Sequence, residues 1–479
     1  MGMVGKIKEL LKAGILYSVG NALNSLIGFL LLPICTSQFP VDGYAVINLA
    51  ILVGALSSTF TYLGASSAML RFYYDYQSRD TQQKMVNSAY LIVVLGGLFQ
   101  LLVGFAFRGT FSNWVFSTPD YGYLLVLSLA LASVQTINTS FFILLRCDDK
   151  NVKYVTLNAV TLLLSIGIMI IWLRFEVELY VPIVSQLIGN VAVMLIMALN
   201  YKIKLFDVKR EEIKKIMSFG IPVALSSLLF YLLNTSDQLI MKQLGSLYDV
   251  GIYGFGSKIS MIIQSLLIVP FSMIWAQLRM KYKNSEGFDS FMTLVGSYYV
   301  FITSTAALVF SFLGKEIISI ASLGNAEYYQ ALRYIPFLIF AQIVYSSYSV
   351  FDYGIQINNK TKYYAIICFI TLVINLLANY FGIKYLGPSS APIIKLVTYT
   401  IYFFMILYVS QRLYKVTFER RTLIVIILSA LMVVLYLGYA INTSFFVRIA
   451  ITLVYCGFVC LLFINKREMS KLKALNLNR

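Results

Sequence analysis

The chain has 479 residues, of which 59% are hydrophobic and only 12% are charged, and its formal net charge is +17. Soluble domains carry about 25% charged residues, so this composition, with a mean hydropathy of +0.78, excludes an ordinary soluble protein. The chain has no histidine, which removes the commonest general base and metal ligand.

Hydrophobic runs follow one another along nearly the whole chain. Each is close to the ~20 residues that an α-helix needs to cross a bilayer. They predict an all-α polytopic membrane protein with about 14 transmembrane helices. The predicted helices cover residues 13–33, 45–68, 86–107, 121–145, 152–173, 178–200, 218–240, 253–275, 288–312, 331–353, 363–385, 389–411, 422–440 and 447–465.

Lys and Arg residues are concentrated in alternate connections. Most lie in the N-terminal tail, in the connections that follow even-numbered helices and in the C-terminal tail, whereas the other connections hold few. Short cytoplasmic loops are enriched in these residues, so both termini are predicted to be cytoplasmic. Because topology explains the positive charge, no nucleic-acid partner is predicted.

A basic stretch at 201–217 separates two predicted six-helix halves. The chain is thus divided into an N-terminal lobe (1–200), a basic cytoplasmic linker (201–217), a C-terminal lobe (218–411) and an extra helix pair with a basic tail (412–479). A repeat supports the division, since the small and polar face of Gly14, Ser18, Asn21, Ser25 and Gly28 has the same spacing as Gly220, Ala224, Ser227, Tyr231 and Asn234. Such parallel repeats are typical of one class of secondary transporter.

Amide side chains occur within several predicted helices. Any single one is explained by helix packing, but so many amides would be costly against lipid and fit better around a wet cavity. The candidate substrate-binding amides are Asn21, Asn24, Gln135, Asn138, Asn234 and Gln342.

Charged residues inside predicted helices are a sharper signal. Each costs at least ~2.5–3.5 kcal/mol at a helix centre, so function is the default hypothesis. Asp237, Lys258, Asp352 and Lys395 are therefore further candidates for substrate binding. Two structural alternatives stay open: the lysines snorkel to the outer interface, or Asp237 pairs with Lys258 on the neighbouring helix.

Arg71 and Arg146 end the second and fourth predicted helices at the basic side. Either they set topology, or their guanidinium groups contact an anionic substrate, since arginine forks suit phosphate oxygens. No phosphate-binding loop of the GxxxxGK[ST] type is present. The sequence predicts a protein that binds and transports a substrate, with no catalytic residue, cofactor or metal.

Short motifs occur in a particular order along this frame. Leu32-Pro33-Ile34 ends the first helix, Asp42-Gly43-Tyr44 follows it, and Leu70-Arg71-Phe72-Tyr73 ends the second. In the second half the corresponding segments are Phe219-Gly220-Ile221-Pro222, Ser236-Asp237, Gly251-Ile252-Tyr253, Lys258-Ile259 and Pro270-Phe271-Ser272. This order resembles the polysaccharide-transporter (O-antigen flippase, Wzx-type) branch of the multidrug/oligosaccharidyl-lipid/polysaccharide exporter superfamily.

The resemblance implies two lobes around a central cavity that work by alternating access. It implies translocation of undecaprenyl pyrophosphate-linked oligosaccharide from the inner to the outer leaflet of the bacterial cytoplasmic membrane, for O antigen, capsule or exopolysaccharide. The expected partners are this lipid-linked oligosaccharide and membrane lipids, and other polysaccharide-assembly membrane proteins are candidates. A cation-coupled multidrug exporter is the main alternative, and a membrane-embedded polymerase or a scaffold are others. Intramembrane charges that lean basic favour the flippase over an exporter of cationic drugs.

Overall fold

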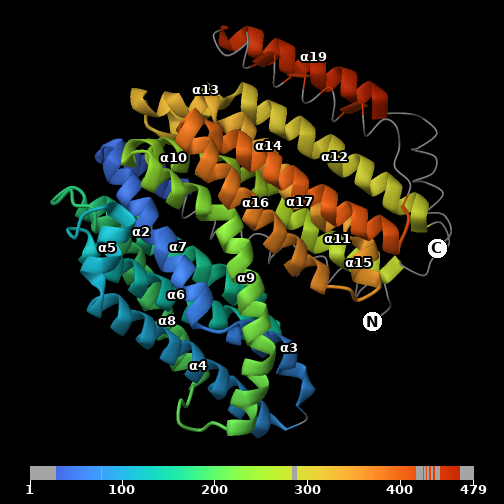
Figure 1. Ribbon diagram of the computed structural model, residues 1–479. Coiled ribbons are helices and arrows are strands. Elements are labelled where there is room, and N and C mark those ends of the chain that lie inside the picture. The colour runs from blue at the N-terminus through green and yellow to red at the C-terminus, as the bar shows by residue number, and fades with distance from the viewer. Residues whose placement is uncertain are drawn as a thin grey trace.

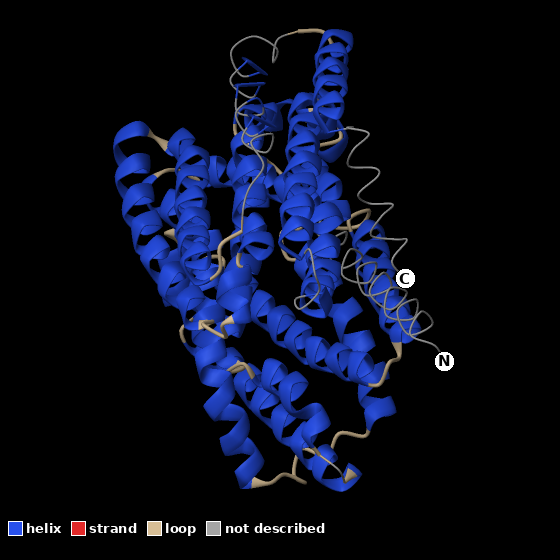
Figure 2. Cartoon of the chain, turned by 90° about the vertical axis from the view of Figure 1, so that its right-hand side faces the viewer, coloured by secondary structure: helices blue, strands red, loops and turns tan. Residues whose placement is uncertain are grey.

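The structure is a computed structural model, and it describes residues 29–76, 78–282, 288–416, 424–425, 428, 431–432, 435–436 and 443–463. Throughout these residues the regular structure is helical, and no strand occurs among them (Figure 2). Ten of the described helices are long and apolar enough to cross a membrane, and two shorter apolar helices cover Phe29–Gln38 and Phe445–Phe458. The predicted all-α polytopic membrane fold is confirmed.

The helices up to α8 form one group and those from α10 to α17 form another, with α9 between them (Figure 1). The first group contains α2 (Val41–Thr61), α3 (Ala65–Phe72), α4 (Arg79–Ala106), α5 (Arg108–Phe116), α6 (Gly122–Cys147), α7 (Asn151–Trp172) and α8 (Val181–Tyr201). The second contains α10 (Leu247–Ile263), α11 (Val269–Tyr282), α12 (Phe288–Phe312), α13 (Gly314–Ala321), α14 (Ile335–Phe351), α15 (Tyr353–Ile357), α16 (Lys362–Leu386) and α17 (Ala391–Leu413). The last described helix, α19 (Phe445–Phe463), packs along α12 at the edge.

The order of elements repeats between the two groups. Each begins with an interrupted long helix, followed by a long helix, a short one and three further helices. The packing repeats as well, because α8 packs against α6 and α7 as α17 packs against α14 and α16. Both copies start at the same end of the bundle, as parallel repeats require.

Two ends of the bundle are named here by their connections. The basic end holds residues 73–76, 148–150, 202–209 and 358–361, and the opposite end holds 39–40, 117–121, 245–246 and 387–390. Helix α9 (Arg210–Leu244) runs the whole way between them. Ile216 near its start belongs to an apolar core with α4, α6 and α8, whereas Leu233 belongs to one with α14, α16 and α17. The single helix α9 thus takes part in both groups.

Several helices differ from the sequence-based prediction at their ends or in their middles. The helix predicted over 45–68 is divided at 62–64, where Leu63 and Gly64 have positive φ angles of 53° and 66°. The helix predicted over 253–275 begins at Leu247 and continues through a π-helical turn, Gln264–Ile268, to Tyr282. Since a proline lacks the amide N–H of a regular helix, this wider turn, which ends two residues before Pro270, has a local cause.

The predicted helix over 331–353 is also shorter, because Asp352 separates α14 from α15 and a 3-10 helix, Ala326–Arg333, precedes them. Helix α9 starts at Arg210, so part of the predicted linker is helical. The short helices α5 and α13 were not predicted. Most of the helices predicted over 13–33 and 422–440 lies outside the described residues.

Gly64 permits a close backbone contact between α9 and the first group. A Cβ atom at Gly64 would lie 2.3 Å from the carbonyl oxygen of Gly220, and one at Gly220 would lie 2.2 Å from that of Leu63. Glycines at both positions therefore allow the two backbones to touch.

Gly64→Ala is expected to lower the apparent melting temperature of the purified protein in detergent by about 3 °C or more. The left-handed conformation costs about 1–2 kcal/mol with a Cβ, a free energy that shifts the melting temperature by a few degrees, and the backbones must also separate. Gly167→Ala in α7 is the matched control, since its Cβ would meet nothing within 4 Å. Equal melting temperatures for the two variants would contradict the contact.

Candidate functional site

A cavity of about 540 Å³ lies between α2 on one side and α9, α10 and α14 on the other. Its walls carry amides, hydroxyls and aromatic rings. The polar and aromatic lining residues are Asn48, Thr59, Tyr62, Ser227, Phe230, Tyr231, Asn234, Thr235, Gln238, Ser257, Lys258, Gln264 and Tyr345. Such a surface offers hydrogen bonds to a polar headgroup together with rings against which a sugar can pack.

Lys258 is the one charged residue among the described residues that line the cavity. It is half-buried on α10, and no hydrogen bond or ion pair joins it to another residue in the described part of the chain. An ammonium group in a partly dry cavity without a counter-ion attracts an anion strongly. The cavity can therefore hold a phosphate group at Lys258 and hydroxyl groups at the surrounding amides.

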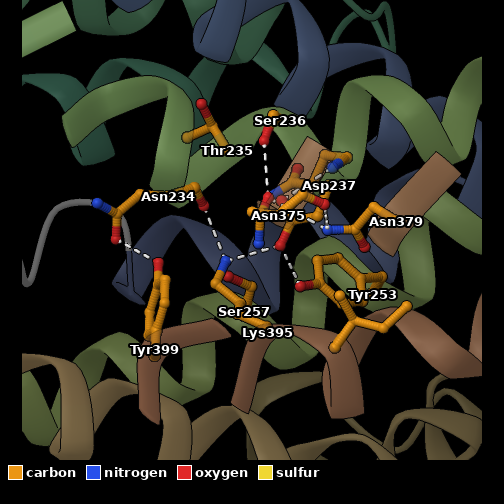
Figure 3. Close-up of polar contacts among 12 residues, drawn as sticks. Asn234, Thr235, Ser236, Asp237, Tyr253, Ser257, Asn375, Asn379, Lys395 and Tyr399 are labelled. Carbon is orange, nitrogen blue, oxygen red and sulfur yellow. Dashed lines mark hydrogen bonds and ion pairs between the residues drawn. The ribbon is translucent and has the colours of Figure 1, made fainter. Parts of the chain in front are cut away.

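Behind the cavity wall, Asp237 and Lys395 form a buried ion pair (Figure 3). Lys395 Nζ lies 2.8 Å from Asp237 Oδ2, and the residues are only 4% and 1% exposed, respectively. Tyr253 also donates its hydroxyl hydrogen to Asp237 Oδ2. The alternative that Asp237 pairs with Lys258 is wrong, and Lys395 does not snorkel to the surface.

Asn234 joins this ion pair to the cavity. Its side chain lines the cavity, and its carbonyl oxygen accepts a 2.8 Å hydrogen bond from Lys395 Nζ. Its Oδ1 accepts a hydrogen bond from the Tyr399 hydroxyl at 2.7 Å. Three of the predicted site residues, Asn234, Asp237 and Lys395, are thus brought together, and Asn234 lines the same cavity as Lys258.

Other candidate residues lie elsewhere in the bundle. Asn138 is buried and donates to the carbonyl oxygen of Asn190 at 2.9 Å, which holds α6 against α8. Gln342 is buried in α14 and Gln135 is exposed on α6, and neither lines the cavity. Asn21 and Asn24 lie outside the described residues.

Asp352 takes part in a second buried ion pair. Arg279 Nη1 lies 2.6 Å from Asp352 Oδ1, and the side chains are 3% and 1% exposed. Tyr364 and Gln356 donate to the other carboxylate oxygen at 2.5 and 2.9 Å. Arg279 lies in α11, beyond the end at residue 275 that the sequence predicted for this helix, and its Nη1 also donates to the carbonyl oxygen of Ser349 at 3.0 Å. This cluster fixes α11 to the junction of α14 and α15.

Arg71 and Arg146 both lie exposed at the basic end. Arg71 Nη1 is 3.5 Å from Asp75 Oδ1, and Arg146 lies near the start of the connection held by Asp148. Burial by itself raises the pKa of Asp148, but hydrogen bonds from Lys150, Tyr73 and Tyr201 outweigh it, so the net pKa is lowered. The charged carboxylate fastens this connection at neutral pH.

Sequence analysis missed Asn48, Gln238 and Ser257 as lining residues of the cavity. The signal for Asn48 was present, since an amide within an apolar helix facing the second half needs a wet or hydrogen-bonded site. Gln238 directly follows Asp237 and could have been included with it. Among the described residues, no group of three His, Cys, Asp or Glu side chains is placed to hold a metal ion.

Comparison with known families decides the assignment. The sequence profile of the family described as polysaccharide biosynthesis protein (Polysacc_synt) matches residues 10–275, more than half of the chain. The chain belongs to this family. The search of curated proteins found no match.

Solved structures of transporters share the fold of this polysaccharide biosynthesis protein. A lipid II flippase MurJ in an inward closed conformation matches with a TM-score of 0.75 at 17% identity, covering 94% of this chain and 98% of that one. An inward-facing multidrug resistance MATE family transporter of the MOP superfamily gives 0.60 at 15% identity, covering 84% and 94%. A MOP superfamily transporter from Pyrococcus furiosus gives 0.57 at 15% identity, covering 84% and 95%. These structures show a shared fold, and the family match confirms the predicted resemblance to polysaccharide transporters.

Proposed function

We propose that this protein is a flippase that moves lipid (undecaprenyl pyrophosphate)-linked oligosaccharide repeat units from the inner to the outer leaflet of the bacterial cytoplasmic membrane. The observation that carries the proposal is the cavity between the two helix groups, with its amides, its hydroxyls and Lys258, which has no partner in the described part of the chain. Amides recognise sugar hydroxyls, and a cation recognises the pyrophosphate. The family, and the lipid II flippase among the proteins of similar fold, support this choice.

The orientation follows from the loop charges. Lys202, Lys204 and Lys209 lie in one connection of the basic end, so this end is assigned to the cytoplasm, as are both chain termini. The cargo then reaches the cavity from the cytoplasmic side, where Arg71 and Arg146 are exposed to its phosphates. With the inside negative, outward movement of an anion gains about 2.3 kcal/mol per charge per 100 mV.

A strain that lacks this gene is expected to accumulate undecaprenyl-linked oligosaccharide and to lose the surface polysaccharide built from it. The physical reason is that assembly on the outer leaflet is deprived of its precursor. Mass spectrometry of the lipid extract and staining of the surface glycan measure the two effects. Purified protein in vesicles should also expose a labelled lipid-linked oligosaccharide to an impermeant modifying reagent without converting it to product, which an enzyme would do. Normal precursor levels with an intact surface glycan would overturn the proposal.

A cation-coupled multidrug exporter is the second candidate, since MATE family transporters share the fold. Cationic drugs favour a cavity with acidic groups, but the charged lining residue among those described here is a lysine. We therefore expect the deletion strain to keep its normal resistance to cationic dyes. Increased dye sensitivity, together with normal precursor levels, would favour the exporter.

A further inference from the structure

Asn48 and Gln238 form a hydrogen-bonded bridge between the two helix groups. Asn48 Nδ2 on α2 lies 2.7 Å from Gln238 Oε1 on α9, and the two residues are 8% and 6% exposed. Both line the cavity. Since α9 packs against α16, where Ser236 donates to Asn375 Oδ1 at 3.1 Å, the bond connects the first group to the second across the cavity. It is called the amide bridge below.

The amide bridge lies at the cavity end that faces the opposite end of the bundle. Asn48 is seven residues from the start of α2, and Gln238 is six residues from the end of α9. A Cβ atom at Gly254 would lie 2.8 Å from Asn48 Nδ2, so the neighbouring helix α10 leaves no space around the bridge. A path from the cavity to the opposite end must pass this point.

Beyond the amide bridge, α2 and α10 cross at close range. A Cβ atom at Gly251 would lie 2.5 Å from the carbonyl oxygen of Val41. Tyr44 and Phe255 pack on Tyr328 with ring centroids 6.1 and 4.6 Å apart, and these rings belong to one buried apolar core. The cavity is thus closed at this end by two layers, the polar bridge facing the cavity and the apolar crossing outside it.

The buried ion pair is bonded to the same helical turn as the amide bridge. The backbone N–H of Gln238 donates to Asp237 Oδ1 at 2.9 Å, while Lys395 holds Oδ2 of the same carboxylate. In a regular α-helix that N–H donates to the carbonyl oxygen of Asn234, which here accepts from Lys395 Nζ. Lys395 and the Gln238 amide therefore contact the same two residues. A displacement of the ion pair moves the backbone that carries Gln238.

On the basis of the proposed function, we propose that Asn48 and Gln238 form the inner layer of the outer gate, and that the Asp237–Lys395 pair positions Gln238 in the closed gate. The chemistry of the bridge suits this task. Separation of the two buried amides is unfavourable unless new partners replace the lost hydrogen bond, because a buried polar group without a partner is costly. Sugar hydroxyls of a loaded cargo supply such partners, both donor and acceptor. Opening is then favoured when a glycan is present and disfavoured when the cavity is empty.

The gate is tested first by closing it chemically. In a chain whose five native cysteines are replaced, Asn48→Cys and Gln238→Cys are joined by a short bifunctional methanethiosulfonate. Transport of labelled lipid-linked oligosaccharide in vesicles is expected to fall at least tenfold and to return on reduction, which excludes misfolding as the cause. The control pair is Ser58→Cys with Gln100→Cys, whose native side chains meet within the first group at 3.4 Å. Undiminished transport by the cross-linked Asn48–Gln238 pair would overturn the proposal.

Positioning by the ion pair is tested by accessibility. The reporter is Ser257→Cys in the cavity, labelled by an impermeant maleimide added from the outer side. Asn48→Ala, Asp237→Asn and Lys395→Met are each expected to raise the labelling rate by about 3- to 10-fold, the effect of losing one hydrogen bond. The double variant Asn48→Gln/Gln238→Asn exchanges the two amide side chains, so their combined length is unchanged. Its labelling rate at Ser257→Cys should be as slow as that of the reporter alone.

A fully buried residue controls for general loosening of the fold. Ser165 is 0% exposed in α7, and Ser165→Cys should stay unlabelled in all of these variants. An unchanged rate at Ser257→Cys, or equal increases at both reporters, would overturn the positioning role. The labelling assay needs no cargo, so it tests the gate separately from the proposed function. If the labelling rates change as expected but the protein moves no glycan, the proposed function is contradicted and the gate proposal still holds.

Discussion

Removing either member of the buried Asp237–Lys395 pair is expected to destabilise the protein far more than removing both. Asp237→Asn leaves the Lys395 ammonium buried without its counter-ion, and Lys395→Met leaves the Asp237 carboxylate buried without its counter-ion. Loss of one partner of a buried ion pair costs about 3–5 kcal/mol, whereas replacing both with neutral groups is often close to neutral. Each single variant should lower the apparent melting temperature by roughly 5–10 °C, and the double variant Asp237→Asn/Lys395→Met should recover most of it.

Thermal unfolding of the purified variants in one detergent measures this double-mutant cycle. The exposed pair Asp80–Lys84 is the matched control, with an oxygen–nitrogen distance of 2.6 Å on the surface of α4. Asp80→Asn should leave the melting temperature nearly unchanged, since exposed ion pairs contribute little to stability. Additive losses at Asp237 and Lys395 would mean that the two charges do not depend on each other, contrary to the 2.8 Å contact.

The partnership of Asp237 and Lys395 also shows where sequence reasoning ended. Each residue was conspicuous because it interrupts an apolar run, and this was enough to select both as candidates. Their partnership was not readable, because 158 residues separate them and only the packing of α17 against α9 brings them together. Proximity along the chain suggested Lys258 instead, which lines the cavity and has no partner among the residues that the structure describes.

The same contrast holds for the helices. Apolar runs of bilayer length predicted the membrane-spanning helices, since the length needed to cross the bilayer is a property of each run alone. The break at 62–64 depends on two residues with positive φ, and hydropathy does not register backbone angles. The helix predicted to end at residue 275 continues to Tyr282 and includes Arg279, whose charge is paired with the distant carboxylate of Asp352. Pairing between distant helices was thus the part that sequence could not supply.

Replacing Lys258 should have the opposite pattern of effects from breaking the Asp237–Lys395 pair. Transport should fall strongly, whereas stability should change little. Lys258→Met removes a charge that has no partner among the described residues, so the melting temperature should stay the same or rise. Transport of lipid-linked oligosaccharide in vesicles should fall about 10- to 100-fold, because a hydrogen bond to a charged group contributes about 1.5–3 kcal/mol. Lys258→Arg should retain most of the activity, since a guanidinium group also binds phosphate, and Lys258→Glu should abolish it.

Lys242→Met provides the control for loss of a positive charge as such. Lys242 is half-buried near the end of α9, where its Nζ lies 3.2 Å from Ser117 Oγ, and it does not line the cavity. Its replacement should leave transport within twofold of the unmodified protein, a difference of about 0.4 kcal/mol. If Lys258→Met also transports at that rate, the cavity does not recognise its cargo through a cation. The flippase would then have to recognise the cargo only through its glycan. A deficit confined to Lys258, rescued by arginine and worsened by glutamate, requires an anion at that position during transport, because neither packing nor stability changes in that order.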